Sequence, residues 1–174
     1  MRPHPSGGAA FVYGCEPYKW TLAGEKKMAD SQVIDEMLRT AKTIAVVGMS
    51  DKPSRASYKI GGYLASHGYR VLPVNPVLDE VQGVKCFADL DAAQDAARAE
   101  TGAGIDMVDV FRASEYVPAI VDDVMRLGIP YLWLQDGVMH EEAVARARAA
   151  GVKCVQNDCI YRQHAAWRNL QAAQ

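Results

Sequence analysis

The sequence predicts a single α/β domain built on a parallel, doubly wound sheet. The first observation is a series of short, nearly uniform apolar runs such as Thr43–Val47, which are typical of strands buried on both faces of such a sheet. The second is that segments with a helical spacing of apolar residues separate these runs. The third is that the connections are short, so each right-handed crossover lays its helix on a face of the sheet. A length of 174 residues fits one domain.

Strand and helix alternate from residue 31 almost to the end of the chain. Ser31 can cap the first helix, whose apolar residues between Val33 and Ala41 share one face. Strands are expected over residues 43–47, 70–74, 84–87, 107–111, 131–134 and 153–155. Helices are expected over residues 31–41, 57–67, 90–100, 115–127, 140–150 and 160–171.

Residues 1–27 differ from the rest of the chain. They combine Pro and Gly with scattered aromatic residues and show no sustained period. Their longest apolar stretch, residues 9–13, is shorter than the apolar core of at least seven residues in a secretory signal. We therefore expect residues 1–27 to be a mostly disordered N-terminal extension and residues 28–174 to form the working domain.

Composition excludes several classes of protein. The formal net charge is −2, so the chain lacks the basic excess that marks a nucleic-acid binder. No apolar run approaches the ~20 residues that a membrane-spanning helix needs. The four cysteines form no Cys-x-x-Cys pair, which argues against a zinc site. We expect them to be reduced thiols of a cytoplasmic protein.

Ligands of doubly wound sheets bind outside the carboxyl ends of the strands, where the strand order reverses. The loop that follows the first strand is the most informative of these positions. Gly48 lets a ligand approach the backbone closely, and the next helix offers free amide groups. Hydroxyls at Ser50 and Ser57 and charges at Lys52 and Arg55 suit phosphate. The alternative is a capped helix with solvated charges, and neither common glycine-rich nucleotide motif matches the loop.

Each of the other strand ends also admits two interpretations. Asn75 and Pro76, after Val74, form either a turn that ends the sheet or a polar wall for a nucleotide. At the next strand end, Phe111 can stack on an aromatic group, and Arg112 either meets a phosphate or is a solvated charge. The last of these loops consists of Gln135, Asp136 and Gly137.

Two further features concern packing and catalysis. Gly61 and Gly62 lie inside an expected helix, where each costs about 1 kcal/mol, so we expect close helix-to-sheet packing beside the site. Asp109 falls on a strand and is expected to be structural or solvated. Cys159 is the one thiol at a plausible position on the rim of the sheet, but we expect it to serve as a small buried hydrophobe. No nucleophile is joined to a base, and we predict neither a catalytic residue nor a metal site.

Five stretches of the chain occur in a characteristic order. They are Ile44–Tyr58, Gly68–Pro76, Asp106–Arg112, Trp133–Gly137 and Asn157–Cys159. Together they resemble the single-domain coenzyme A-binding proteins of bacteria and archaea, and the likeness spans about residues 31–168. The chain is also similar to the N-terminal domain of the succinyl-CoA synthetase α subunit. The resemblance implies a Rossmann-like fold and a site for coenzyme A or acyl-CoA.

The same resemblance implies which residues touch the ligand. In the larger family the loop after the first strand holds the CoA phosphates, and it corresponds here to Gly48, Met49, Ser50, Lys52, Arg55 and Ser57. The ends of the other strands flank the nucleotide and the pantetheine, which implies Val74, Asn75, Pro76, Phe111, Arg112, Gln135, Asp136 and Gly137. The synthetase also needs a second domain with a phosphorylated histidine, so ligase activity is not implied.

Two other functions remain open at this point. One is an NAD(P)-dependent oxidoreductase on the same fold, and the other is a CoA-linked thiol or acyl-transfer protein that uses Cys159. The second strand ends without the acidic residue that usually holds the ribose of NAD. Met49 and Ser50 follow Gly48 where NAD-binding loops have a further glycine. We therefore expect a CoA-binding protein, which acts alone, with a protein partner or as a homo-oligomer.

Overall fold

A parallel sheet of five strands forms the centre of the molecule. The computed structural model describes residues 30–173. The strands are β1 (Thr43–Val47), β2 (Arg70–Val74), β5 (Met107–Val110), β6 (Tyr131–Leu134) and β7 (Lys153–Val155). They lie in the order β2-β1-β5-β6-β7, and every neighbouring pair is parallel. The predicted fold class, an α/β protein with a doubly wound parallel sheet, is confirmed.

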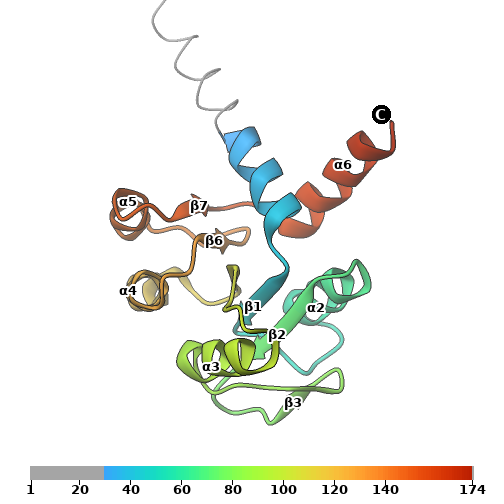
Figure 1. Cartoon of the computed structure of the whole chain (residues 1–174), viewed down its shortest axis with the longest axis vertical. Coiled ribbons are helices and arrows are strands. Elements are labelled where there is room, and N and C mark those ends of the chain that lie inside the picture. Colours follow the sequence, from blue (N-terminus) through green and yellow to red (C-terminus); the bar gives the residue numbers. More distant parts are fainter. Residues whose placement is uncertain (1–29, 174) are drawn as a thin grey trace, which may run out of the picture.

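Helices cover both faces of this sheet. They are the helix over residues 30–40, α2 (Ala56–Ser66), α3 (Leu90–Thr101), α4 (Val117–Leu127), α5 (Glu141–Ala149) and α6 (Ile160–Ala172). Helices α3, α4 and α5 share one apolar core with Ala45, Val108 and Leu132 of the strands. The helix over residues 30–40, α2 and α6 share the other core with Ile44, Val46 and Trp133. Figure 1 shows α4 and α5 on one side of the strands and α2 and α6 on the other.

Successive side chains of β5 point to opposite faces of the sheet. Val108 and Val110 belong to the core of the α3–α5 face, whereas Met107 belongs to the core of the α2–α6 face. Because side chains alternate along a strand, Asp109 points to the α2–α6 face as well. Its register partners are Val46 on β1 and Trp133 on β6.

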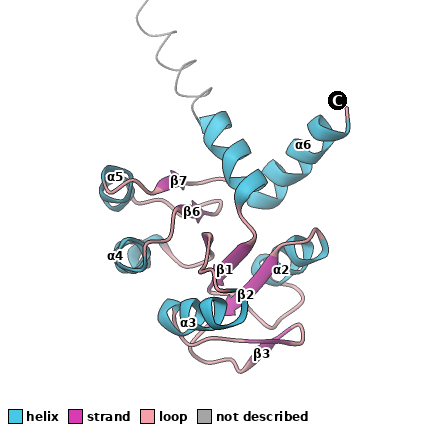
Figure 2. Cartoon of the chain, in the orientation of Figure 1, coloured by secondary structure: helices cyan, strands magenta, loops and turns pink. Residues whose placement is uncertain are grey.

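One predicted strand differs from the structure. Residues 84–87 do not form a strand of the main sheet. Instead β3 (Glu80–Val81) and β4 (Val84–Lys85) make a small antiparallel hairpin outside it, as Figure 2 shows for β3. The turn residues Gln82 and Gly83 both have positive φ, 55° and 77°, which is the geometry of a two-residue hairpin turn. The end of this segment meets the sheet through an isolated parallel bridge between Phe87 and Val74, made by backbone hydrogen bonds of 2.8 and 2.9 Å.

The start of one predicted helix also differs. The helix expected over 115–127 begins as a short 3₁₀ turn, Ser114–Tyr116, and becomes α-helical at Val117, because Pro118 suits the first turn of an α-helix. The extension expected over residues 1–27 lies outside the described residues. Among residues 30–173, none of the helices is long and apolar enough to cross a membrane.

Candidate functional site

The strand order reverses between β1 and β5, so this is the switch point of the sheet. From β1 the chain goes to β2 on one side and later returns to place β5 on the other side. The loop after β1 leads into α2 on one face, and the loop after β5 leads to α4 on the opposite face. A crevice for a ligand is expected where the two loops part at the carboxyl edge of the sheet.

Gly48 brings the two loops into close contact at this edge. Its φ is +81°, a conformation that side chains disfavour. A Cβ atom there would lie 2.9 Å from Cδ of Arg112 and 3.1 Å from the carbonyl oxygen of Phe111. The backbone N–H of Phe111 donates to the Val47 oxygen at 2.9 Å, which holds the first residue of that loop beside β1. Glycine at position 48 is therefore required for both conformation and space.

Hydrogen bonds inside the site shape the loop after β1. The Asn75 amide donates to the Met49 carbonyl at 3.0 Å, and its Oδ1 accepts from the Val77 N–H at 3.1 Å. The Ser50 N–H donates to Oγ of Ser57 at 3.0 Å, while the Ser50 Oγ accepts from the Lys52 N–H at 3.1 Å. Asn75, Ser50 and Ser57 thus position the loop. The predicted residues of the loop after β1 and of the end of β2 therefore lie close together. Some of their polar atoms form hydrogen bonds with one another.

The amino end of α2, which follows this loop, carries the positive end of the helix dipole. Arg55 occupies the N-cap position, its side chain does not cap the helix, and the first turn holds no acidic residue. The amide groups of the first turn therefore retain the partial positive charge that favours an anion.

Three cations surround the loop. The side chains of Lys52 and Arg55 are exposed, and Arg112 is half-buried with its guanidinium 4.2 Å from the ring centroid of Tyr116. None of the three has a carboxylate partner within the described chain, whereas other arginines of the molecule do. Positive charge without an internal partner, next to free amide donors, suits a phosphate.

The loop after β6 is arranged differently. Arg162 on α6 holds Asp136 with two hydrogen bonds of 2.8 and 3.0 Å, and this guanidinium keeps the pKa of Asp136 below its usual range. The Gly137 N–H donates to Oδ1 of Asn157 at 2.9 Å. Asp136 is thus bound to α6 and Gly137 to the segment that leads into it. Gln135 continues the sheet through a 3.3 Å hydrogen bond from its N–H to the Val110 oxygen.

Asp109 is a feature that sequence reasoning assigned only a structural or solvated role. Its side chain is completely buried, and Oδ1 accepts a 2.7 Å hydrogen bond from Nε2 of Gln135. Oδ2 has no partner within residues 30–173. Burial raises the pKa of Asp109 to about 7, and the Gln135 bond opposes this only in part. The acidic residue inside an otherwise apolar strand was the one sign in the sequence of a buried polar group. Its partner Gln135 follows another strand, so the sequence did not reveal the pair.

Close packing explains why Gly61 and Gly62 occur inside α2, beside the site. A Cβ on Gly61 would lie 2.4 Å from Cε of Met49, and a Cβ on Gly62 would lie 3.0 Å from the side chain of Gln82. The two glycines do allow a close approach, but of α2 to the loop after β1 and to the turn of the β3–β4 hairpin, whereas the sequence predicted close packing on the sheet. The Gln82 amide also donates to the Tyr58 carbonyl at 2.8 Å and fastens the β3–β4 hairpin to α2.

The thiols differ in their surroundings. Cys86 and Cys154 are buried, and burial raises the pKa of both, that of Cys154 to about 11. Cys159 is half-buried at the N-cap of α6, where Oδ1 of Asp158 accepts a 2.8 Å hydrogen bond from its N–H. Of these three cysteines, Cys159 is thus the most accessible. Cys15 lies outside the described residues.

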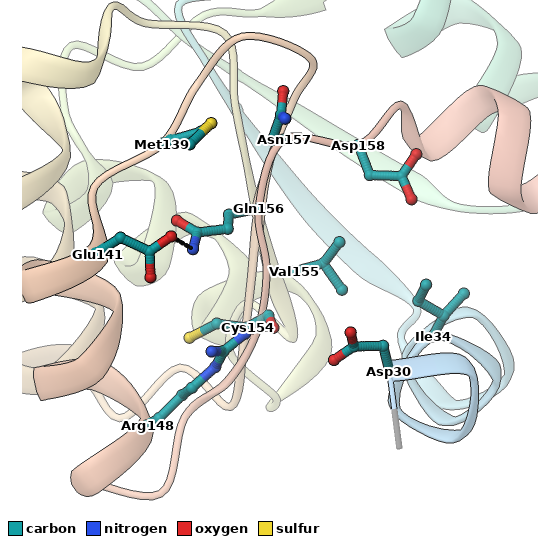
Figure 3. Close-up of a pocket in the computed structure, with 10 residues that line it drawn as sticks. All are labelled: Asp30, Ile34, Met139, Glu141, Arg148, Cys154, Val155, Gln156, Asn157 and Asp158. Atoms are coloured by element: carbon teal, nitrogen blue, oxygen red, sulfur yellow. Dashed lines mark hydrogen bonds between the residues drawn. The ribbon is translucent and has the colours of Figure 1, made fainter. Parts of the chain in front are cut away.

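A hollow of about 280 Å³ lies along β7 (Figure 3), away from the switch point. Asp30, Glu141 and Asp158 contribute carboxylates to its lining, against the single guanidinium of Arg148, which donates to the Cys154 carbonyl at 3.0 Å. None of the predicted ligand-contacting residues lines it. Its acidic lining repels a polyphosphate, so we place the candidate site at the β1–β5 edge.

The chain matches a known family over most of the fold. Residues 42–165 fit the family described as CoA binding domain. The chain is also 36% identical over 132 residues to the uncharacterized protein YneT of Bacillus subtilis (strain 168), a match that covers 76% of this chain and 92% of that protein. The resemblance to coenzyme A-binding proteins is confirmed.

Solved structures share the same architecture. A hypothetical protein from Pyrococcus horikoshii OT3 superposes with a TM-score of 0.70 at 33% identity, covering 79% of this chain and 92% of that one. A protein from Thermus thermophilus gives 0.68 at 32% identity, covering 79% and 98%. A dinucleotide-forming acetyl-coenzyme A synthetase from Ca. Korarchaeum cryptofilum gives 0.56 at 27% identity, covering 70% of this chain but 27% of the synthetase.

Proposed function

Because the chain belongs to the CoA-binding domain family, we propose that it binds coenzyme A or an acyl-CoA across the carboxyl edge of the sheet. The observation that carries this proposal is the loop after β1. It combines the close backbone turn at Gly48, the uncapped amino end of α2 and the cations Lys52 and Arg55, with Arg112 of the loop after β5 beside it. None of these three cations has a carboxylate partner among residues 30–173. Coenzyme A carries a diphosphate and a 3′-phosphate, which match this concentration of donors.

The strand order supports a direction for the ligand. In dinucleotide-binding sheets the first ribose lies at the end of the second strand. We accordingly place the adenosine near Asn75 and Pro76 and the diphosphate against Gly48, Ser50 and the amino end of α2. The pantetheine arm then passes Phe111 and Arg112 toward Gln135.

The end of β2 favours coenzyme A over NAD. An NAD site usually presents a carboxylate there to the ribose hydroxyls. Here Val74 is followed by Asn75, whose amide already donates to the Met49 carbonyl and whose oxygen accepts from Val77. A carboxylate at this point would repel a 3′-phosphate, whereas the neutral asparagine does not.

Mass spectrometry of the ligand released from the purified protein tests the proposal. Coenzyme A or an acyl-CoA in a near-stoichiometric amount is expected after denaturation of protein purified without added ligand, or after incubation with coenzyme A and gel filtration. A parallel incubation with NAD and NADP provides the comparison. Retention of NAD or NADP, with no retention of coenzyme A, would overturn the proposal.

A further inference from the structure

A buried acidic side chain lies directly behind the carboxyl edge of the sheet. Asp109 is 0% exposed, flanked in the sheet by Val46 and Trp133, and has no cation against it within the described chain. Burial of a carboxyl with one unpartnered oxygen costs stability, and an apolar residue would pack better between those neighbours. Polar groups kept at such a cost often serve a site.

The single side-chain partner of this carboxyl within residues 30–173 is an amide at the edge. Nε2 of Gln135 donates to Oδ1 of Asp109 at 2.7 Å. A carboxylate only accepts hydrogen bonds, so it obliges the Gln135 side chain to turn its NH₂ group inward. Within the planar amide group the carbonyl oxygen Oε1 then points away from the Asp109 carboxylate, and the Nε2 bond is the only side-chain hydrogen bond of Gln135 among the described residues. Gln135 is 4% exposed, so a ligand can reach it only at the edge of the sheet.

The position of Gln135 at the end of β6 is where the arm of a bound ligand would pass. Gln135 is the first residue after β6 and continues the ladder beside Val110, next to the loop of Phe111 and Arg112. A ligand whose phosphates lie at β1 and whose nucleoside lies at β2 can reach β6 only with its remaining arm. The pantetheine arm of coenzyme A contains two amide N–H donors, which an oriented carbonyl can accept.

We propose that Asp109 is a positioning residue that holds the Gln135 amide so that its Oε1 accepts a hydrogen bond from an amide N–H of the pantetheine arm. This inference rests on the proposed function and adds a specificity-determining residue to it. The proposed hydrogen bond involves the pantetheine arm and not the nucleotide, so its loss should affect only ligands that contain the arm.

The experiment compares two ligands by calorimetry at pH 8, on the alkaline side of the raised pKa of Asp109. One is coenzyme A, and the other is adenosine 3′,5′-bisphosphate, which carries phosphates and adenine but no pantetheine. Asp109→Leu removes the carboxyl and Gln135→Met removes the amide at nearly constant volume. Each is expected to weaken coenzyme A binding about five- to ten-fold and to leave the bisphosphate affinity unchanged.

A double variant tests whether Asp109 acts through Gln135. If it does, the double variant loses no more coenzyme A affinity than either single variant, since both remove the same hydrogen bond. Met107→Ala is the matched control: it lowers core packing on the same strand and face, two residues from Asp109, without touching the edge. It is expected to lower the melting temperature with both affinities unchanged.

Three results would overturn the positioning role: equal losses for the two ligands, additive losses in the double variant, or unchanged coenzyme A affinity in Gln135→Met. The last comparison needs only the edge variant, so it stands even where Asp109→Leu fails to fold. Failure of the proposed function has a different signature, because the unaltered protein would then bind neither coenzyme A nor the bisphosphate.

Discussion

Single residues at the β1–β5 edge divide into those that shape the loop and those that offer charge. Asn75, Ser50 and Ser57 direct their polar atoms at backbone groups of the loop itself. Lys52 and Arg55 have no carboxylate partner within the described chain and extend from the same loop. Substitutions in the first group should alter the loop, whereas those in the second should alter affinity alone.

Arg55→Ala should weaken coenzyme A binding about ten-fold, because it removes a charge-assisted hydrogen bond to phosphate. The melting temperature should hardly change, since Arg55 is exposed and caps nothing with its side chain. Lys59→Ala is the matched control, as it removes one positive charge from the exposed surface of the same helix one turn later. Equal affinity losses in the two variants, measured by calorimetry, would mean that general charge and not Arg55 itself attracts the ligand.

Asp109 should also govern how stability depends on pH. Burial raises its pKa to about 7, above the unfolded value of about 4. The folded state therefore retains a proton that the unfolded state releases between these values. Stability from this group is complete below about pH 4 and falls by up to roughly 1.4 kcal/mol per pH unit toward pH 7.

Asp109→Asn removes the ionisation while keeping the size of the side chain. Urea midpoints should show the variant gaining stability relative to the unaltered protein as the pH rises from 5 to 8. A difference between the two proteins that stays constant over this range would show that Asp109 does not take up a proton on folding.

How much of the site could be predicted from sequence depends on how its residues are joined. Gly48, Ser50 and Arg55 follow one apolar run closely in the sequence, so their place in the loop at the carboxyl edge of the sheet could be predicted. The Asp109–Gln135 pair joins two strands that are adjacent only in the folded sheet, and its register is not visible in the chain. The resemblance therefore implied Gln135 as a residue beside the ligand, whereas Asp109 was expected to be structural or solvated and its bond to Gln135 was not predicted.

At the scale of elements, α6 is fastened to α2 by a cluster of rings. His164 on α6 is 2% exposed, and its Nδ1 lies 2.9 Å from the hydroxyl of Tyr63 on α2. The ring of His164 lies 5.3 Å from that of His67 and 5.6 Å from that of Trp167. Trp167 in turn donates from Nε1 to Oδ1 of Asp35 at 2.9 Å, which joins α6 to the helix over residues 30–40.

This cluster should make the docking of α6 sensitive to acid. Burial, followed by the charges of His67 and Arg168, lowers the pKa of His164 to about 4, below the unfolded value of about 6.5. The unfolded state therefore binds a proton that the folded state excludes, and stability falls as the pH drops from about 6.5 toward 4. Tryptophan fluorescence against urea should record this loss.

His164→Phe separates the proton from the packing. The variant loses the Tyr63 bond and so is less stable at pH 7, but its stability should fall less steeply between pH 6.5 and 4.5. His140→Gln serves as the control, because His140 is half-buried at the N-cap of α5, outside the cluster. An equally steep acid loss in His164→Phe would place the sensitive group elsewhere.

Predicted elements agree with the structure where the pattern spans many residues. The uniform apolar runs of β1, β5 and β6 and the spaced apolar residues of α4 each identify one structure. Residues 84–87 were misassigned because a two-residue turn at Gln82 and Gly83 folds them back on residues 80–81. A short run of this kind can pair either with the main sheet or with the residues just before the turn. Four residues are too few to show which pairing forms.

For the whole molecule, the decisive feature is that the strand order reverses beside the loop that is richest in donors. The order β2-β1-β5-β6-β7 places β1 next to β5, and the loops that follow these strands lead to helices on opposite faces, beyond the close contact of Gly48 with Arg112. An apolar core packs against each face of the sheet behind this edge. Coenzyme A should then bind with little rearrangement of the sheet.

Thermal unfolding with coenzyme A, NAD and NADP at equal concentration tests this account most directly. Ligand at a hundred times its dissociation constant adds about 2.7 kcal/mol of stability. In a domain of this size each kcal/mol raises the melting temperature by about 2–4 °C. Coenzyme A should therefore raise the melting temperature by several degrees, less so in Arg55→Ala, while NAD and NADP leave it unchanged. A larger shift with NAD or NADP than with coenzyme A would contradict the account.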